Sequence, residues 1–227
     1  MGAHDPALPR QLALALDHRE SFDREDFLPG AGNAAALALI DRWPDWPARV
    51  IALTGPEGAG KSHLAAIWAA AAGARLISAR AIDAACVPQA LSTGALVVED
   101  AGDLDEAAVF HLLNLAHEQG AYILLTARGS PASWPVALPD LASRLRAVPA
   151  VALAAPDDAL LRAILVKLFA DRQLAVDDAL IFYLMTRIER SFAAARAAVA
   201  ELDRAALRLK RPVNRALAGE ILRARAP

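Results

Sequence analysis

The chain has 227 residues, a net charge of −2 and a single cysteine, Cys86. This length allows one α/β domain with a small helical addition and a sizeable buried core. One cysteine excludes an intramolecular disulfide framework and a zinc site built on cysteine thiolates. Hydrophobic residues make up 56% of the chain, but no apolar run reaches the ~18–20 residues that a membrane helix needs, and the N-terminus lacks the pattern of a secretion signal. We therefore expect a cytoplasmic protein with no membrane segment.

Basic residues are concentrated toward the carboxyl-terminal end. From Arg187 onward there are ten Lys and Arg against four Asp and Glu, so this part carries +6 and the rest of the chain −8. Such an excess can form a surface that binds phosphates. It can equally be the solvated face of helices whose other faces are alanine and leucine. The sequence leaves both interpretations open.

The hydrophobic pattern predicts alternating strands and helices over the first two thirds of the chain. A helix is expected at 33–42, ended by the prolines of the segment 43–47. The expected strands are 50–54, 76–78, 95–98, 122–126 and 150–153, and the next expected helices are 61–72 and 106–119. Strands that alternate with helices predict a parallel sheet with helices on both faces.

After Pro156 the pattern indicates helices alone. Asp157 or Asp158 can cap a helix with one continuous apolar stripe. Further helices are expected at 178–187, at 191–209 and from near Pro212. We therefore expect an N-terminal tail at 1–20, an α/β subdomain at 21–155 and an all-helical subdomain at 156–227.

The most informative motif is Gly55-Pro56-Glu57-Gly58-Ala59-Gly60-Lys61-Ser62. It matches the phosphate-binding P-loop, G-x-x-x-x-G-K-S, and it lies between a predicted strand and a predicted helix, as that chemistry requires. The glycines let backbone N–H groups approach phosphate oxygens, Lys61 reaches the β- and γ-phosphates, and Ser62 ligates Mg²⁺. His63 follows in the first turn of the helix and is counted with the nucleotide-binding residues. The motif predicts a bound nucleoside diphosphate or triphosphate with Mg²⁺.

Two acidic residues, Glu99 and Asp100, follow the predicted strand 95–98. They stand at the carboxyl end of a buried strand, where ligand sites of α/β proteins lie. A P-loop site needs such an acid to hold the metal and to polarise the attacking water. Glu99 is a candidate metal ligand together with Ser62, and Asp100 a candidate base. Because the usual order places aspartate first, either acid can take the metal role, and both can also be simple turn residues before Gly102.

The P-loop, the acidic strand end and the helical subdomain together resemble an AAA+ ATPase, and more narrowly the DnaA/Hda branch of replication-initiation regulators. The segments 21–23 and 28–33 are similar to the family's opening segment, which implies a wall on the adenine side of the nucleotide. The family more often has aspartate where Ala127 stands, so Thr126 is the candidate γ-phosphate sensor (sensor 1). The resemblance implies ADP or ATP as the ligand, a P-loop AAA+ core and a C-terminal helical lid.

Two arginines take catalytic or sensing roles by this resemblance. Arg144, in the segment 140–145, matches the family's finger arginine, which acts on the nucleotide of a neighbouring subunit, and Arg146 is near enough to leave that assignment open. A finger arginine is worth ~10³–10⁵ in rate. Arg190, in the segment 188–192, matches the sensor-2 arginine and implies a phosphate contact from the lid. Each arginine can also be an ordinary surface cation.

The N-terminal tail contains Gln11, Leu12, Leu14 and Leu16, which resemble the sliding-clamp-binding peptide of Hda-type proteins. In such a peptide the glutamine anchors by hydrogen bonds and alternate leucines enter apolar pockets of the partner. Taken alone, the segment can also be an edge strand or a tail. The chain stops at Pro227, where DnaA continues into a DNA-binding domain, so we expect no DNA-binding domain here.

These features favour an Hda-type regulator that binds adenine nucleotide, tethers to the DNA polymerase sliding clamp and promotes ATP hydrolysis by DnaA, with weak or no ATPase activity of its own. The alternative is a stand-alone P-loop ATPase, such as a helicase loader or a DnaA-like motor, acting on single-stranded nucleic acid. Against it, 5% of residues are aromatic, and none interleave with the basic residues as a stacking platform for single strands does. A third hypothesis is a nucleotide-bound assembly module without catalysis. It differs from the first hypothesis mainly in the role of Arg144. A homodimer is compatible with the resemblance, but the sequence does not fix the oligomeric state.

Overall fold

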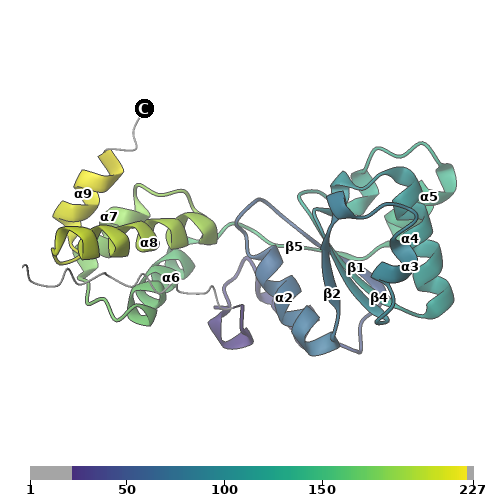
Figure 1. Ribbon diagram of the computed structural model, residues 1–227, viewed down its shortest axis with the longest axis horizontal. Helices are drawn as coiled ribbons and strands as arrows, with labels where there is room; N and C mark the ends of the chain where they lie inside the picture. The colour runs from purple at the N-terminus through teal and green to yellow at the C-terminus, as the bar shows by residue number, and fades with distance from the viewer. Residues whose placement is uncertain (1–21, 224–227) are drawn as a thin grey trace, which may run out of the picture.

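The computed structural model describes residues 22–223, which form two lobes (Figure 1). The clamp-like residues Gln11, Leu12, Leu14 and Leu16 lie outside the described residues. The first lobe is an α/β subdomain built on a five-stranded parallel sheet of order β2-β3-β4-β1-β5. Its strands are β1 (Val50–Thr54), β2 (Arg75–Ser78), β3 (Ala95–Glu99), β4 (Tyr122–Ala127) and β5 (Ala150–Ala152).

Helices cover both faces of this sheet, because successive residues of a strand point to opposite sides. Ile51 and Leu53 of β1 pack with α1 and α2, whereas Ala52 packs on the other side with α3 and α4. The helices of this lobe are α1 (Ala34–Asp41), α2 (Lys61–Ala72), α3 (Val87–Ala90), α4 (Glu106–Gln119) and α5 (Pro139–Ala147). The sequence pattern did not predict α5, because this short helix buries only Leu141 and Leu145, too few residues to reveal its period.

The second lobe is the helical lid, and with the parallel sheet it confirms the predicted fold class. Its helices are α6 (Asp158–Asp171), α7 (Asp178–Met185), α8 (Phe192–Leu209) and α9 (Arg215–Arg223). Their apolar stripes form a separate core. The last helix begins at Arg215 and not near Pro212, because the side chain of Asn214 caps it by accepting the Leu217 N–H at 3.0 Å. None of the helices among residues 22–223 is long and apolar enough to cross a membrane.

The lid contacts the α/β lobe through the segment before α1 and through the loop after β1. Leu28 packs against the lid core, and Lys167 of α6 forms an ion pair with Asp26 at 2.6 Å. The backbone N–H of Phe192 donates a hydrogen bond to the carbonyl oxygen of Gly58 at 3.0 Å. The first turn of α8 is therefore attached directly to the P-loop.

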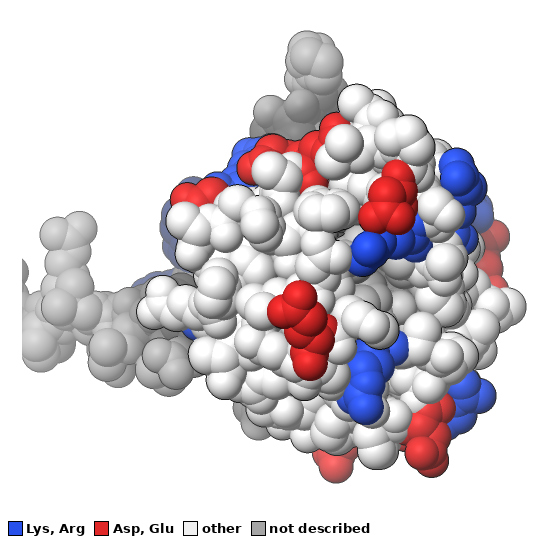
Figure 2. Space-filling view, turned by 90° about the vertical axis from the view of Figure 1, so that its right-hand side faces the viewer, with Lys and Arg blue, Asp and Glu red and all other residues white. Residues whose placement is uncertain are grey.

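The end of the molecule that lies away from the lid is formed by α3, α4 and α5, and its surface carries mixed charge (Figure 2). Acidic and basic side chains alternate there in small groups over a mostly uncharged surface. Ion pairs such as Arg80 with Asp103 and Arg144 with Asp140 belong to this part of the chain. Close pairing of opposite charges leaves little net field over this end of the molecule.

Candidate nucleotide-binding site

The P-loop connects β1, which lies between β4 and β5 in the sheet, to the first turn of α2. Gly55, Gly58 and Gly60 all have positive φ, of 146°, 72° and 97°. A Cβ at these positions would meet the Leu153 carbonyl oxygen at 2.3 Å, the Ser191 Cβ at 2.5 Å and the Phe27 ring at 3.3 Å. The loop therefore needs glycine both for its backbone conformation and for space.

The Lys61 ammonium group is folded onto this loop. Its Nζ donates hydrogen bonds to the carbonyl oxygens of Gly55 and Pro56, both at 2.8 Å. Burial lowers the pKa of Lys61, and the charge of Asp100 partly offsets this effect. A phosphate bound by the loop would compete with these two neutral carbonyls for the ammonium, and its charge makes it the stronger acceptor.

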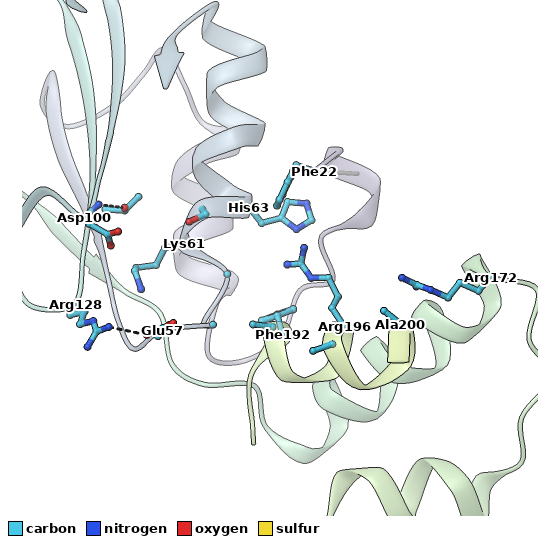
Figure 3. A pocket seen from close by; sticks show the side chains of 16 residues that line it. Phe22, Glu57, Lys61, His63, Asp100, Arg128, Arg172, Phe192, Arg196 and Ala200 are labelled. Atoms are coloured by element: carbon cyan, nitrogen blue, oxygen red, sulfur yellow. Dashed lines mark hydrogen bonds and ion pairs between the residues drawn. The ribbon is translucent and has the colours of Figure 1, made fainter. Parts of the chain in front are cut away.

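A cavity of about 630 Å³ opens beside the loop, between the α/β lobe and the lid (Figure 3). Lys61, Asp100 and Thr126 line it from the α/β lobe, and Phe192 and Arg196 line it from α8. The volume lies within the range of pockets that hold small ligands and cofactors. The cavity thus combines phosphate-binding chemistry on one wall with a cation from the helical lid on the other.

Asp100, and not Glu99, faces this cavity. Asp100 follows β3 with a φ of 53°, and its backbone N–H donates to the hydroxyl oxygen of Thr126 at 3.2 Å. Glu99 is half-buried at the end of β3, in register with Ser78 of β2, and does not line the cavity. Ser62 does line it. A P-loop magnesium ion takes one or two protein oxygens and completes its shell with phosphate and water, so Ser62 and Asp100 fit that ion.

Arg190 lies outside the cavity. Its guanidinium pairs with Asp158 at the start of α6, at 2.7 Å, and the side chain is 58% exposed. Arg196 is a lid cation that does line the cavity, and it extends from α8 toward His63 (Figure 3). Arg190 precedes the helix, whereas Arg196 stands four residues after Phe192 and so shares its face of α8. The four-residue spacing between Phe192 and Arg196 is the feature of the sequence from which the position of Arg196 could have been predicted.

Aromatic rings enclose another part of the cavity. His63 lies between Phe22 and Phe27, edge-to-face with each at centroid distances of 5.3 Å. Its Nε2 is 3.1 Å from the carbonyl oxygen of Asp23, and burial lowers its pKa. His63 therefore ties the segment before α1 to α2. Phe22, over which the guanidinium carbon of Arg196 lies at 5.6 Å, forms an apolar wall where the resemblance implies the adenine side.

Two further arginines, which the sequence pattern did not indicate, line the cavity. Arg128 follows β4 and pairs with Glu57 of the P-loop at 2.8 Å. Arg172, after α6, has its Nε 3.8 Å from Asp203 of α8. Figure 3 places these two arginines at opposite ends of the cavity. Arg128 lies two residues after the predicted sensor residue Thr126, so its position in the sequence was a signal, whereas Arg172 is brought to the cavity only by the packing of α6 on α8.

Arg144 lies away from this cavity, on α5. Its Nη1 donates to the side-chain oxygen of Asn114 at 2.6 Å, and its Nε is 2.9 Å from Asp140. It lines a different cavity, of about 440 Å³, which also contains Arg49 just before the first residue of β1. Arg144 is therefore not placed to act on a nucleotide in its own P-loop, and its role at a neighbour's nucleotide stays a prediction.

No protein-family model and no curated protein matches this chain. Solved structures do match it. Domain III of the replication initiation protein DnaA from Thermotoga maritima aligns with a TM-score of 0.71 and 17% identity, covering 89% of this chain and 96% of that chain. The fold is that of the AAA+ ATPases. RuvB from the same organism aligns with a TM-score of 0.73 and 15% identity, covering 90% of this chain and 72% of that one. AMPPCP-bound DnaA from Aquifex aeolicus aligns with a TM-score of 0.64 and 19% identity, covering 79% of this chain and 64% of that chain.

Proposed function

We propose that this chain is a DnaA-related, Hda-like regulator that binds an adenine nucleotide with Mg²⁺ and promotes ATP hydrolysis by DnaA. The observation that carries the nucleotide site is the cavity in which Lys61, Asp100 and Thr126 meet Arg196 of the lid. Solved DnaA structures of the same fold contain AMPPCP, which supports adenine as the base. The apolar wall at Phe22 is consistent with that choice.

In this proposal the phosphates replace the carbonyls of the P-loop as partners of Lys61. Backbone N–H groups at the start of α2 bind the phosphate oxygens, and Ser62 and Asp100 hold the Mg²⁺, which neutralises phosphate charge when bound. Arg196, from the lid, supplies a second cation in addition to Lys61. Because Phe192 N–H is bonded to the carbonyl of Gly58, a change in the loop on nucleotide binding moves the lid.

Arg144 is proposed to act in trans, on ATP held by DnaA. Its place on α5, away from its own nucleotide cavity, supports a role toward a neighbouring molecule. The guanidinium then exchanges Asn114 and Asp140 for the phosphates of the partner nucleotide. The tail at 11–16 is proposed to tether the chain to the sliding clamp, which brings it to DnaA near loaded DNA.

The test is an ATP hydrolysis assay with DnaA and clamp-loaded DNA. The wild-type chain should accelerate hydrolysis, Arg144→Ala should lose at least a hundredfold of that acceleration, and Arg146→Ala should keep most of it. Deleting residues 1–16 should abolish clamp pull-down and the dependence on clamp. The proposal fails if wild type gives no acceleration, or if Arg144→Ala accelerates as well as wild type.

A second candidate function is a stand-alone DnaA-like ATPase. Asp100 and Thr126 lie beside Lys61 in one cavity, and an acid and a hydroxyl at the phosphate end are what hydrolysis in the chain's own site requires. Turnover by the isolated chain that Lys61→Ala abolishes, without any response to clamp or DnaA, would favour this function over the regulator.

A further inference from the structure

An ion pair lies at the phosphate end of the nucleotide cavity. Nη2 of Arg128 is 2.8 Å from Oε2 of Glu57, so a guanidinium that follows β4 holds a carboxylate of the P-loop itself (Figure 3). Both side chains line the cavity, and they are 78% and 82% exposed. A carboxylate in a loop that binds phosphates is unexpected, because like charges repel each other. This pair therefore bears on phosphate binding, unlike an ion pair on a surface away from the site.

The backbone fixes where Arg128 begins. β4 pairs with β1 in parallel register, with Thr54 opposite Ala127. The N–H of Gly55 donates a hydrogen bond to the carbonyl oxygen of Ala127 at 3.2 Å. Arg128 therefore starts beside the first residue of the P-loop, and its side chain extends to the third residue of that loop, Glu57.

The charges at the phosphate end of the cavity balance when no phosphate is bound. Two cationic and two anionic side chains line this end: Lys61, Arg128, Glu57 and Asp100 (Figure 3). Burial is the largest influence on the pKa of Lys61 and lowers it, while the charge of Arg128 lowers it further and that of Glu57 raises it. Both members of the ion pair thus act on the ammonium group that binds phosphate. Arg128 becomes a phosphate-binding cation only by leaving Glu57.

The ion pair lies where the third phosphate of a bound nucleotide would arrive. Phe22 forms the apolar wall on the proposed adenine side, and in Figure 3 Lys61 lies between Phe22 and Arg128. The backbone and the lysine of a P-loop bind the β- and γ-phosphates. A diphosphate that begins on the adenine side therefore ends near Lys61, whereas a triphosphate continues toward Arg128.

We propose that Glu57 and Arg128 determine how strongly the site distinguishes a nucleoside triphosphate from a nucleoside diphosphate. The inference rests on the proposed nucleotide site, but not on DnaA or the clamp. A diphosphate leaves the ion pair intact. A third phosphate takes Arg128 from Glu57, because phosphate oxygens match a guanidinium bidentately and an exposed ion pair holds its partners weakly. Glu57 therefore weakens triphosphate binding, and Arg128 strengthens it.

Thr126, the γ-phosphate sensor expected from the sequence, acts differently. Its hydroxyl oxygen accepts the backbone N–H of Asp100 at 3.2 Å, and the side chain is neutral. A contact between this hydroxyl and a third phosphate separates no ion pair. Arg128 instead exchanges one anion for another, so the partner of Glu57 depends on the number of phosphates bound.

The test is calorimetric titration of ADP and of AMPPCP into the full chain at constant Mg²⁺. Glu57→Gln should tighten AMPPCP binding about three- to fivefold, the upper range for an exposed ion pair. Arg128→Gln should weaken AMPPCP binding about tenfold, as expected when a charged hydrogen bond to phosphate is lost. ADP affinity should change less than about twofold in both variants, which also reports that the fold and the P-loop are intact.

The double variant Glu57→Gln/Arg128→Gln separates this exchange from simple repulsion. If Glu57 acts through Arg128, its replacement should tighten AMPPCP binding less than about twofold once Arg128 is absent, because the two effects are coupled. An equal gain with and without Arg128 would show that Glu57 only repels phosphate, and would overturn the inference.

The matched control is the lid ion pair of Arg211 and Glu220, which is joined at 2.8 Å and does not line the cavity. Glu220→Gln and Arg211→Gln make the same changes of charge and should leave the ratio of AMPPCP to ADP affinity as it is in wild type. Equal shifts in the control and cavity variants would assign the effect to net charge and overturn the inference.

Failure of the nucleotide site and failure of this inference give different results. A wild-type chain that binds neither nucleotide would refute the proposed site, and the inference with it. Normal binding of both nucleotides by wild type, with an unchanged affinity ratio in Glu57→Gln and Arg128→Gln, would refute the inference alone.

Discussion

The backbone N–H of Phe192 and the carbonyl oxygen of Gly58 are 3.0 Å apart (N to O) and hydrogen-bonded, so the first turn of the lid helix α8 rests on the P-loop. The contact is possible because Gly58 has no side chain. A Cβ there would lie 2.5 Å from the Cβ of Ser191, the residue that caps α8. The phosphate-binding loop and the first turn of the lid helix α8 are thus in direct contact.

Gly58→Ala should separate the lid from the P-loop and weaken ADP binding about tenfold or more. The control is Gly73→Ala, which has a similar positive φ, 62° against 72°, but open space around its Cβ. Both variants lose ~1–2 kcal/mol of stability from backbone strain, so only the clash distinguishes them. Titration with a fluorescent ADP analogue measures the difference, and equal affinities in the two variants would contradict the coupling.

Arg196→Ala should lower nucleotide affinity about tenfold, because a hydrogen bond from a charged group to phosphate is worth roughly 1.5–3 kcal/mol. Arg190→Ala should change affinity less than twofold, since Arg190 is engaged with Asp158 and does not line the cavity. Calorimetric titration of ADP into each variant compares the two. The reverse order of effects would return the sensing role to Arg190.

Asp100→Asn should remove most of the gain in nucleotide affinity that Mg²⁺ provides, because Asp100, and not Glu99, is the acid after β3 that lines the cavity. Glu99→Gln should retain that gain, since Glu99 is half-buried at the end of β3 and does not line the cavity. Nucleotide binding with Mg²⁺ and with a chelator gives the ratio for each variant. A larger loss in Glu99→Gln would assign the metal to Glu99.

Lower pH should destabilise the protein through His63. Burial lowers the pKa of His63 in the folded state, with Arg196 acting in the same direction and Asp23 and Asp26 against it. The unfolded chain then binds a proton first, so the stabilisation is complete above the ordinary histidine pKa of about 6.5 and is lost as pH falls below it toward the folded pKa.

Thermal unfolding of wild type and His63→Phe between pH 7.5 and 5.5, roughly one unit either side of that ordinary pKa, tests this. Wild type should lose more melting temperature over the interval than His63→Phe, which cannot titrate. A parallel decline in the two proteins would show that other groups, such as carboxylates, cause the whole effect.

The sequence was sufficient to predict those features that are built from residues close together in the chain. A P-loop is one continuous turn from a strand into a helix, so Gly55–Ser62 and its strand Val50–Thr54 are visible as letters. The parallel sheet followed from the alternation of buried runs with amphipathic segments. The helix α5 was missed because nine residues with two buried leucines show no clear period.

Tertiary structure decided which side chains share a space. Arg196 enters the nucleotide cavity and Arg190 does not, because the cap at Ser191 fixes where α8 starts and therefore which face carries each cation. Asp100 replaces Glu99 at the cavity, because alternate residues of a strand point to opposite sides and the chain turns after β3. Arg215 reaches Tyr183 only because α9 packs on α7. Such contacts join residues distant in the chain, and a single sequence carries no local pattern for them.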